Sequence, residues 1–232
     1  MRMPEGYDII VNDLIDKNPK HKFIRIHPTD VKATLRAVFT SLSSMSWIDA
    51  FDADYMRNSF RQRAERTITH IATKIITGDN DNITENSGEY VVSELARKTI
   101  VDTFDYLDIP LAELFKKQKS GNPGYDFYTE TPIHIILFGE AKYKSDRNAY
   151  AQALQQLNDF EQDQADIEDL VELKEFCSDE GLNNANNGRK GYIAAFSTKL
   201  TRTETLIHHI KQNDDFKALS RFDELICVAI DL

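Results

Sequence analysis

The most constraining feature of this chain is a short apolar stretch that ends in charged residues. The run from Ile133 to Phe138 follows the turn-forming pair Thr131-Pro132 and leads into the segment 139–143, Gly-Glu-Ala-Lys-Tyr. Short apolar runs bounded by turn residues are typical of buried strands. Because side chains alternate between the two faces of a strand, Glu140 and Lys142 are predicted to project to the same side.

A second carboxylate precedes this strand. Asp126 lies in the segment 124–127, Gly-Tyr-Asp-Phe, at the predicted start of the preceding strand, so it can lie beside Glu140 and Lys142 in one hairpin. Two acidic oxygens form a hard site for Mg²⁺ or Mn²⁺, and an adjacent ammonium can orient a water molecule or offset the charge of a phosphorane-like transition state. This combination favours a metal-dependent phosphodiesterase.

A purely structural interpretation of these charges stays open. Unpaired charge inside a protein is costly, so Glu140 and Lys142 need a reason to end a buried strand. Pairing with each other or with neighbouring side chains would satisfy them without any catalytic role.

A helix from about Glu89 to Leu107 is predicted before the hairpin. Glu94 lies beside its apolar stripe, where a site that needs another acid can draw it inward. A lone glutamate on a helix usually faces solvent, and Glu89 is the alternative member of the site. The sequence does not choose between the two.

A second helix, from about Asn148 to Phe160, follows the strands. Gln152, Gln155 and Gln156 flank its apolar stripe. One of these amides can orient a phosphate or the lysine of the site. Solvated surface glutamines explain the pattern equally well, since glutamine is a good helix former.

The order of these residues resembles the PD-(D/E)xK nuclease superfamily over about Ser87 to Leu200. The matching residues, in chain order, are Glu94, Asp126, Glu140, Lys142, and Gln152 or Gln155. The resemblance implies that Asp126, Glu140, Glu94 and the backbone carbonyl of Ala141 hold Mg²⁺, with Mn²⁺ as a substitute. It also implies that Lys142 assists the attacking water and that Gln155 supports the site. The chain departs from the family pattern because no proline directly precedes Asp126.

Within the superfamily, the chain resembles the HamA family, the nuclease subunits of Hachiman anti-phage systems. The resemblance rests on Gly88-Glu89, Ser93-Glu94 and the two strand segments described above, behind a long N-terminal region. It implies a DNA substrate and a helicase partner that controls cleavage. A stand-alone restriction endonuclease and a non-catalytic DNA-binding or scaffold subunit remain as alternatives.

The element pattern predicts an α/β fold with a mixed central sheet flanked by helices, which is a restriction-endonuclease-like core. Residues 87–232 are expected to form this core, and residues 1–86 a mainly helical N-terminal region that contacts DNA or a partner. Further expected elements are strands at Phe23–Ile26, Tyr192–Phe196 and Leu225–Leu232, helices behind a Thr29-Asp30 cap and at Ala53–Thr77 and Thr203–Gln212, and a flexible loop at Gly181–Gly191.

Charge is unevenly distributed along the chain. The net charge is −10, but the segment 158–180 alone carries ten acids and one lysine, so the rest is almost neutral. That segment has apolar residues at helical spacing and predicts an amphipathic helix with an acidic outer face. The predicted helix Ala53–Thr77 carries a basic cluster of exposed arginines, which are Arg57, Arg61, Arg63 and Arg66.

Composition also bounds the location and the chemistry. The N-terminus lacks an apolar signal segment and no run reaches transmembrane length, which predicts a cytoplasmic protein with no membrane partner. Two cysteines are too few for a disulfide framework or a zinc site. The sequence has no phosphate-binding glycine motif and no nucleophile elbow, so no small-molecule cofactor is expected.

Overall fold

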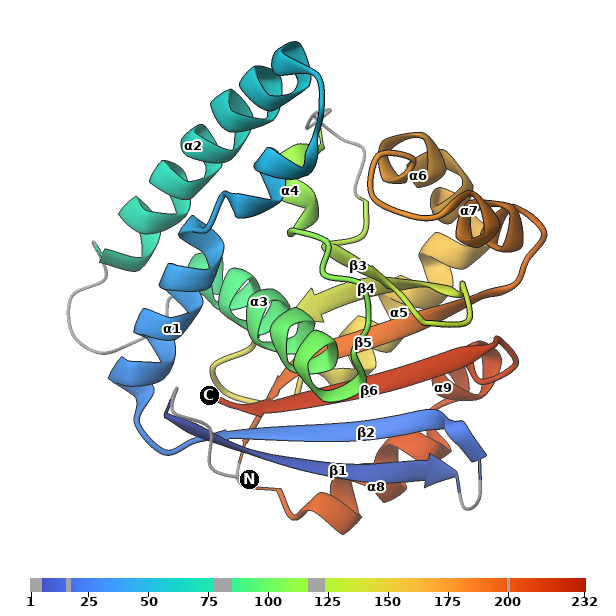
Figure 1. Cartoon of the computed structure of the whole chain (residues 1–232). Helices are drawn as coiled ribbons and strands as arrows, with labels where there is room; N and C mark the ends of the chain where they lie inside the picture. Colours follow the sequence, from blue (N-terminus) through green and yellow to red (C-terminus); the bar gives the residue numbers. More distant parts are fainter. Residues whose placement is uncertain (1–5, 16–17, 77–84, 117–123, 200) are drawn as a thin grey trace.

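The fold is built on one six-stranded mixed sheet (Figure 1). It is seen in a computed structural model that describes residues 6–15, 18–76, 85–116, 124–199 and 201–232. The strands are β1 (Tyr7–Ile15), β2 (Asn18–Pro28), β3 (Phe127–Glu130), β4 (Ile136–Lys142), β5 (Lys190–Thr198) and β6 (Glu224–Asp231). Their order is β1-β2-β6-β5-β4-β3; the inner four run parallel, and both edge strands are antiparallel to their neighbours. The prediction of an α/β fold with a mixed sheet is confirmed.

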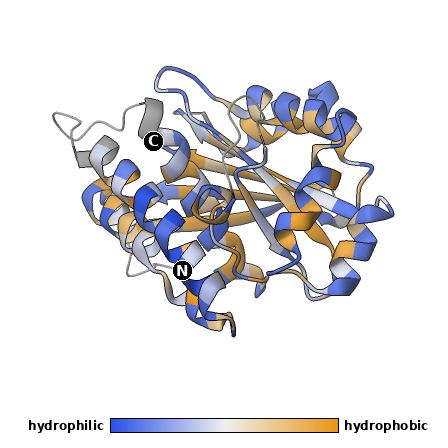
Figure 2. Ribbon diagram, turned by 90° about the horizontal axis from the view of Figure 1, so that it is seen from above, coloured by the Kyte–Doolittle hydropathy of each residue, from blue (hydrophilic) through white to orange (hydrophobic). Residues whose placement is uncertain are grey.

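Helices cover both faces of the sheet. They are α1 (Val31–Ser43), the short 3₁₀ helix η1 (Ser46–Ala50), α2 (Asp54–Ile76), α3 (Glu85–Phe104), α4 (Ala112–Phe115), α5 (Tyr150–Gln162), α6 (Ala165–Leu173), α7 (Asp179–Asn186), α8 (Thr203–Gln212) and α9 (Asp214–Leu219). The predicted cap of α1 is present, since the Asp30 side chain accepts a hydrogen bond from the backbone N–H of Ala33. Figure 2 shows hydrophobic residues concentrated on the central strands, between helices of mixed character.

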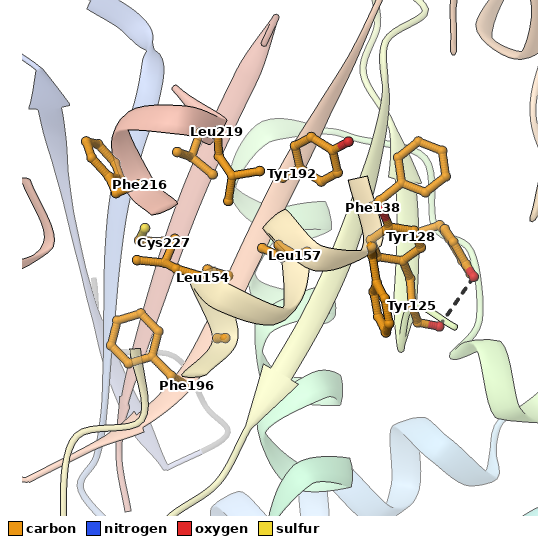
Figure 3. Close-up of a cluster of buried hydrophobic side chains, with 14 of the residues drawn as sticks. Tyr125, Tyr128, Phe138, Leu154, Leu157, Tyr192, Phe196, Phe216, Leu219 and Cys227 are labelled. Carbon is orange, nitrogen blue, oxygen red and sulfur yellow. Dashed lines mark hydrogen bonds between the residues drawn. The ribbon is translucent and has the colours of Figure 1, made fainter. Parts of the chain in front are cut away.

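Alternation along the buried strands produces two hydrophobic clusters. Ile136 and Phe138 of β4 face the cluster under α5, α8 and α9, whereas Leu137 and Ala141 face the cluster under α1 and α3. Figure 3 shows the first cluster, in which Leu154 and Leu157 of α5 lie among aromatic side chains from the strands. A strand buried on both faces explains the nearly continuous apolar run in its sequence.

The N-terminal region shares this sheet. The strand β1 was not predicted, and β2 is longer than the predicted Phe23–Ile26; together they form a hairpin whose β2 pairs in parallel with β6. Tyr7 and Ile24 belong to the same hydrophobic cluster as Val91 and Ile230. The boundary predicted at residue 86 therefore separates two parts of one core, and the N-terminal region contributes strands as well as helices.

The acidic segment 158–180 does not form a single helix. The helix α5 ends at Gln162, Gln164 adopts a left-handed conformation with φ of 58°, and α6 begins at Ala165. The helix α7 also occupies much of the segment Gly181–Gly191, so the prediction of a flexible loop there was wrong. The Ser178 side chain caps α7 by accepting a hydrogen bond from the N–H of Gly181, a signal that the surrounding asparagines and glycines obscured.

The orientation of α6 also differs from the prediction. Asp166 and Asp169 are buried and paired, with Lys190 Nζ at 2.6 Å from Asp166 and Lys116 Nζ at 2.5 Å from Asp169. Val171, one of the apolar residues at helical spacing in the segment 158–180, is 79% exposed. Lysines from other elements turn two of the acids inward, and such long-range partners are not visible in the local sequence pattern. Among the described residues, no helix is both long and apolar enough to cross a membrane.

Candidate active site

The carboxyl-terminal end of β4 carries the predicted pair of charges. Glu140 is 2% exposed, and its Oε1 accepts a hydrogen bond of 2.7 Å from Lys142 Nζ. The two side chains therefore lie on one face of β4, as strand alternation predicts. Lys142 Nζ is also 3.7 Å from Glu89 Oε1, so its ammonium lies between two carboxylates.

Asp126 lies beside this pair because β3 and β4 are adjacent and antiparallel. Its backbone N–H donates to the Gly139 carbonyl at 2.9 Å, and its Oδ2 accepts from the Ala141 N–H at 2.7 Å. The second bond fixes the carboxylate next to the backbone between Glu140 and Lys142. In an extended strand, the N–H and C=O of one residue point to the same edge, so the Ala141 carbonyl also faces Asp126.

The electrostatics of the site are those of crowded, desolvated acids. Burial raises the pKa of Asp126 to about 7, although the Ala141 N–H and Lys142 act in the opposite direction. Burial, and then the charge of Asp126, raise the pKa of Glu140 well above its usual range. Burial alone would lower the pKa of Lys142, but Glu140 and Glu89 raise it, so the lysine stays charged. A further cation beside these carboxylates would favour their ionised forms.

The donor set fits a hard divalent cation. The Oε2 atom of Glu140 is buried and has no hydrogen-bond partner among the residues that the structure describes, although Oε1 is bound to Lys142. Among the described residues, no three His, Cys, Asp or Glu side chains converge on one metal position. Mg²⁺ commonly uses only one or two carboxylates and fills its other positions with water and substrate phosphates. Asp126, Glu140 and the Ala141 carbonyl together match that pattern.

Glu94 is not part of this cluster. It is 1% exposed and belongs to a buried ion pair in which Arg97 donates to Oε2 at 2.8 Å and to Oε1 at 2.6 Å, with Ser41 as a further donor. Five residues along a helix turn the side chain by about 140°, so Glu94 and Glu89 cannot face the same site. The structure thus brings Glu89, the predicted alternative, to Lys142. The i, i+3 spacing of Glu94 and Arg97 was the sequence signal for their pairing.

An open pocket lies beside Lys142. It has a volume of about 470 Å³. Its lining comprises Glu89, Lys142, Lys144, Gln152, Gln155, Gln156 and Asp159. The helix α5 thus brings both predicted glutamines, Gln152 and Gln155, to the same pocket as Lys142. Amide groups there can donate to a bound phosphate without adding charge.

Sequence reasoning missed two residues near Asp126. Glu113 of α4 is among the charges that raise the pKa of Asp126. Burial raises the pKa of Tyr90, and a hydrogen bond to Glu113 and the charges of Asp126 and Glu89 act in the same direction. Neither residue lies in a recognisable motif. Glu113 belongs to the four-residue helix α4, which tertiary packing brings to the site.

Close packing holds Glu89 at the site. The adjacent Gly88 contacts the ring of Tyr143, and a Cβ added at Gly88 would lie only 2.2 Å from a ring carbon. Tyr143 directly follows Lys142 but faces α3, on the other side of β4. Glycine therefore allows the first turns of α3 to approach the end of β4 closely.

Gly88→Ala is expected to lower the free energy of unfolding by about 1–3 kcal/mol, because the new methyl group must displace the Tyr143 ring or α3. Chemical denaturation of the purified protein measures this change. In a Tyr143→Ala background the same substitution is expected to be much less destabilising, since the obstructing ring is gone. Equal losses in the two backgrounds would rule out this contact as the cause.

The predicted basic cluster on α2 is only partly available at the surface. Arg63 donates to the Phe115 carbonyl at 2.7 Å, and Arg57 donates to the carbonyls of Phe51 and Asp52. Both side chains are half-buried, and their hydrogen bonds to backbone carbonyls stabilise the folded chain. Arg61 and Arg66 are exposed, so the expectation that all four arginines lie outside holds for these two.

Comparisons with known proteins give no independent identification: no family model, no curated protein and no solved structure matches the chain. The site geometry is therefore the basis for assigning a function.

Proposed function

We propose that this protein is a metal-dependent nuclease that hydrolyses DNA phosphodiester bonds. The observation that carries the proposal is the group formed by Asp126, Glu140 and Lys142. Two buried acids with raised pKa values lie next to a lysine, and one carboxylate oxygen has no hydrogen-bond partner in the described part of the chain. Such an arrangement is unfavourable for a protein without a cation, and perturbed acids beside a pocket are characteristic of functional sites.

Each group of the chain has a distinct role in this proposal. Asp126, Glu140 and the Ala141 carbonyl would hold Mg²⁺ or Mn²⁺. The bound metal would polarise the phosphodiester and lower the pKa of a bound water. Lys142, held between Glu140 and Glu89, would orient the attacking water and offset charge on the phosphate. Gln152 or Gln155 would donate hydrogen bonds to phosphate oxygens in the pocket.

The biological setting belongs to the proposal as well. The resemblance to the nuclease subunits of Hachiman anti-phage systems supports DNA as the substrate and a helicase as the partner. A protein with a net charge of −10 gains little DNA affinity from its overall charge, so a DNA-loaded partner would help to deliver the substrate. A stand-alone restriction-type enzyme would share the same site chemistry.

One observation favours a second candidate function, a non-catalytic DNA-binding or scaffold subunit. Glu140 already has an ion-pair partner in Lys142, and the described residues contain no metal site with three protein side chains. In this alternative the charges are structural. The two candidates differ in their response to metal.

The deciding experiment is a cleavage assay with purified protein and labelled DNA. Weak cleavage is expected from the isolated protein with Mg²⁺ or Mn²⁺, because no DNA-loaded partner delivers the substrate, and no cleavage is expected after dialysis against EDTA. Ca²⁺ is expected to bind without supporting turnover, because its looser coordination does not hold an in-line water well. Binding of both metals can be followed by calorimetry. Cleavage that persists in EDTA would contradict the proposed chemistry, and metal binding without any cleavage would favour the scaffold alternative.

A further inference from the structure

One asparagine links the two loops that follow β4 and β5, and the first of these loops contributes Lys144 to the pocket. Asn148 lies in the β4–α5 loop. Its Oδ1 accepts hydrogen bonds of 2.8 Å from the Thr198 hydroxyl and from the Lys199 N–H. Its Nδ2 donates to the Thr201 hydroxyl at 3.0 Å. One side chain thus fixes the second loop against the first.

Ser197 provides a second link at the base of the same loops. Its hydroxyl accepts from the Lys144 N–H at 2.8 Å and donates to the Lys144 carbonyl at 3.0 Å. Its own carbonyl accepts from the Ala149 N–H at 3.0 Å. Both ends of the segment 144–149 are therefore attached to the end of β5 by hydrogen bonds to Ser197.

The braced loop carries two cationic side chains, and the first of them lies at the candidate site. Lys144 lines the pocket together with Lys142. Arg147 has a side chain 68% exposed, and its charged neighbour Asp146 is 3.6 Å away in a surface pair of a kind that contributes little. The helix α5 then begins at Tyr150, where no side chain of the described residues caps it, and its first turn contains no acid that would repel an anion.

The cations of the β4–α5 loop lie close in the sequence to an acidic site. Asp126, Glu140 and Glu89 would repel a phosphodiester approaching the pocket. Cations beside the acids allow the flanking phosphates to bind while the acids remain available for metal. Contacts of this kind set the register of a nucleic acid without reading its sequence.

We propose that Lys144 and Arg147 contact the DNA phosphates that flank the cleaved bond, and that Asn148 is a positioning residue which braces their loop. This inference rests on the proposed nuclease function and adds the path of the substrate strand. It predicts that the DNA backbone crosses the end of β4 and β5, beside the first turn of α5.

The test measures binding of a fluorescently labelled DNA duplex to the full chain over a range of salt concentrations, with Ca²⁺ present to limit cleavage. Lys144→Ala and Arg147→Ala are each expected to weaken binding by roughly 3- to 10-fold and to reduce the salt slope by about 1. Arg189→Ala is the matched control, since Arg189 is similarly exposed (57%) but lies next to the opposite end of β5. It is expected to leave binding unchanged.

Asn148 is tested by kinetics as well as by binding. Asn148→Ala is expected to raise KM several-fold with a smaller effect on kcat, whereas Asn148→Asp should retain much of the wild-type KM because it keeps the acceptor for Thr198 and Lys199. An unchanged KM in Asn148→Ala would overturn its positioning role. Thermal unfolding identifies any variant that fails to fold.

The outcomes separate this inference from the proposed function. Metal-dependent cleavage by the wild type, with Lys144→Ala and Arg147→Ala binding DNA as the wild type does, would overturn the phosphate path alone. Weakened binding by both variants in a protein that never cleaves would support the path and refute the nuclease. Weakened binding to RNA but not to DNA would overturn the assignment of DNA as the occupant.

Discussion

Glu140→Ala and Lys142→Ala are each expected to reduce metal-dependent DNA cleavage by at least about a hundredfold while leaving the protein folded. The first substitution would remove a metal ligand, and the second would remove the group that orients the attacking water. Both side chains leave the end of β4, and the apolar residues that precede them keep the strand in place. Cleavage rates with purified proteins, together with circular dichroism, measure the two effects.

The helix α6 offers a matched control. Glu172 and Lys174 have the same Glu-x-Lys spacing but lie in the α6 region, outside the pocket next to Lys142. Glu172→Ala and Lys174→Ala are expected to cleave DNA at the wild-type rate. Full activity in Glu140→Ala would remove Glu140 from the mechanism, and equal losses in the control pair would point to a general defect instead.

Local patterns were sufficient to predict most of the sheet that carries the site. The apolar runs of β4, β5 and β6 and the alternation within β4 predicted which residues share a face, because a strand buried on both sides has few alternative arrangements. The edge strand β1 was missed. It alternates less clearly, and within the described segments it lies at the sheet edge and pairs with β2 alone.

Helical site residues were harder to predict because a helix can turn either of two acids toward a strand. Glu94 and Glu89 were both candidates, and the decision depended on Arg97, which holds Glu94 in a buried ion pair. Glu113 and Tyr90 could not have been found from spacing, since α4 and α3 meet at Asp126 only in the folded chain. The same reasoning explains α6, where buried lysine partners override the hydrophobic pattern.

Strand positions were predicted more accurately than buried charges, and the difference has a physical basis. A strand position is specified by its immediate neighbours, whereas a buried charge is specified by a partner that can lie anywhere in the sequence. Asp126 was identified because its partner, the N–H of Ala141, lies on the adjacent strand of the same hairpin. Asp169 was not identified as a buried, paired acid, because its partner Lys116 lies 53 residues away in the sequence.

Asp126→Asn is expected to stabilise the metal-free protein at pH 8 and to abolish its metal binding. The folded state raises the pKa of Asp126 from its ordinary value of 3.8 to about 7, because the carboxylate is buried among other acids. The folded protein therefore binds this proton more tightly than the unfolded chain does. The contribution of Asp126 to stability falls as pH rises from about 4 through 7, and above that range the charged group destabilises the metal-free protein by on the order of a few kcal/mol.

Asparagine removes this penalty and retains an oxygen acceptor for the Ala141 N–H, so the hairpin geometry should persist. Denaturation at pH 4.5 and pH 8, with and without Mg²⁺, measures the effect. Without metal, the free energy of unfolding of the variant should exceed that of the wild type mainly at pH 8. Mg²⁺ should stabilise only the wild type, by an amount set by its binding affinity. If the variant is less stable than the metal-free wild type at pH 8, the Asp126 carboxylate stabilises the folded protein. A residue kept for metal binding at the expense of stability should instead give a more stable variant when it is replaced.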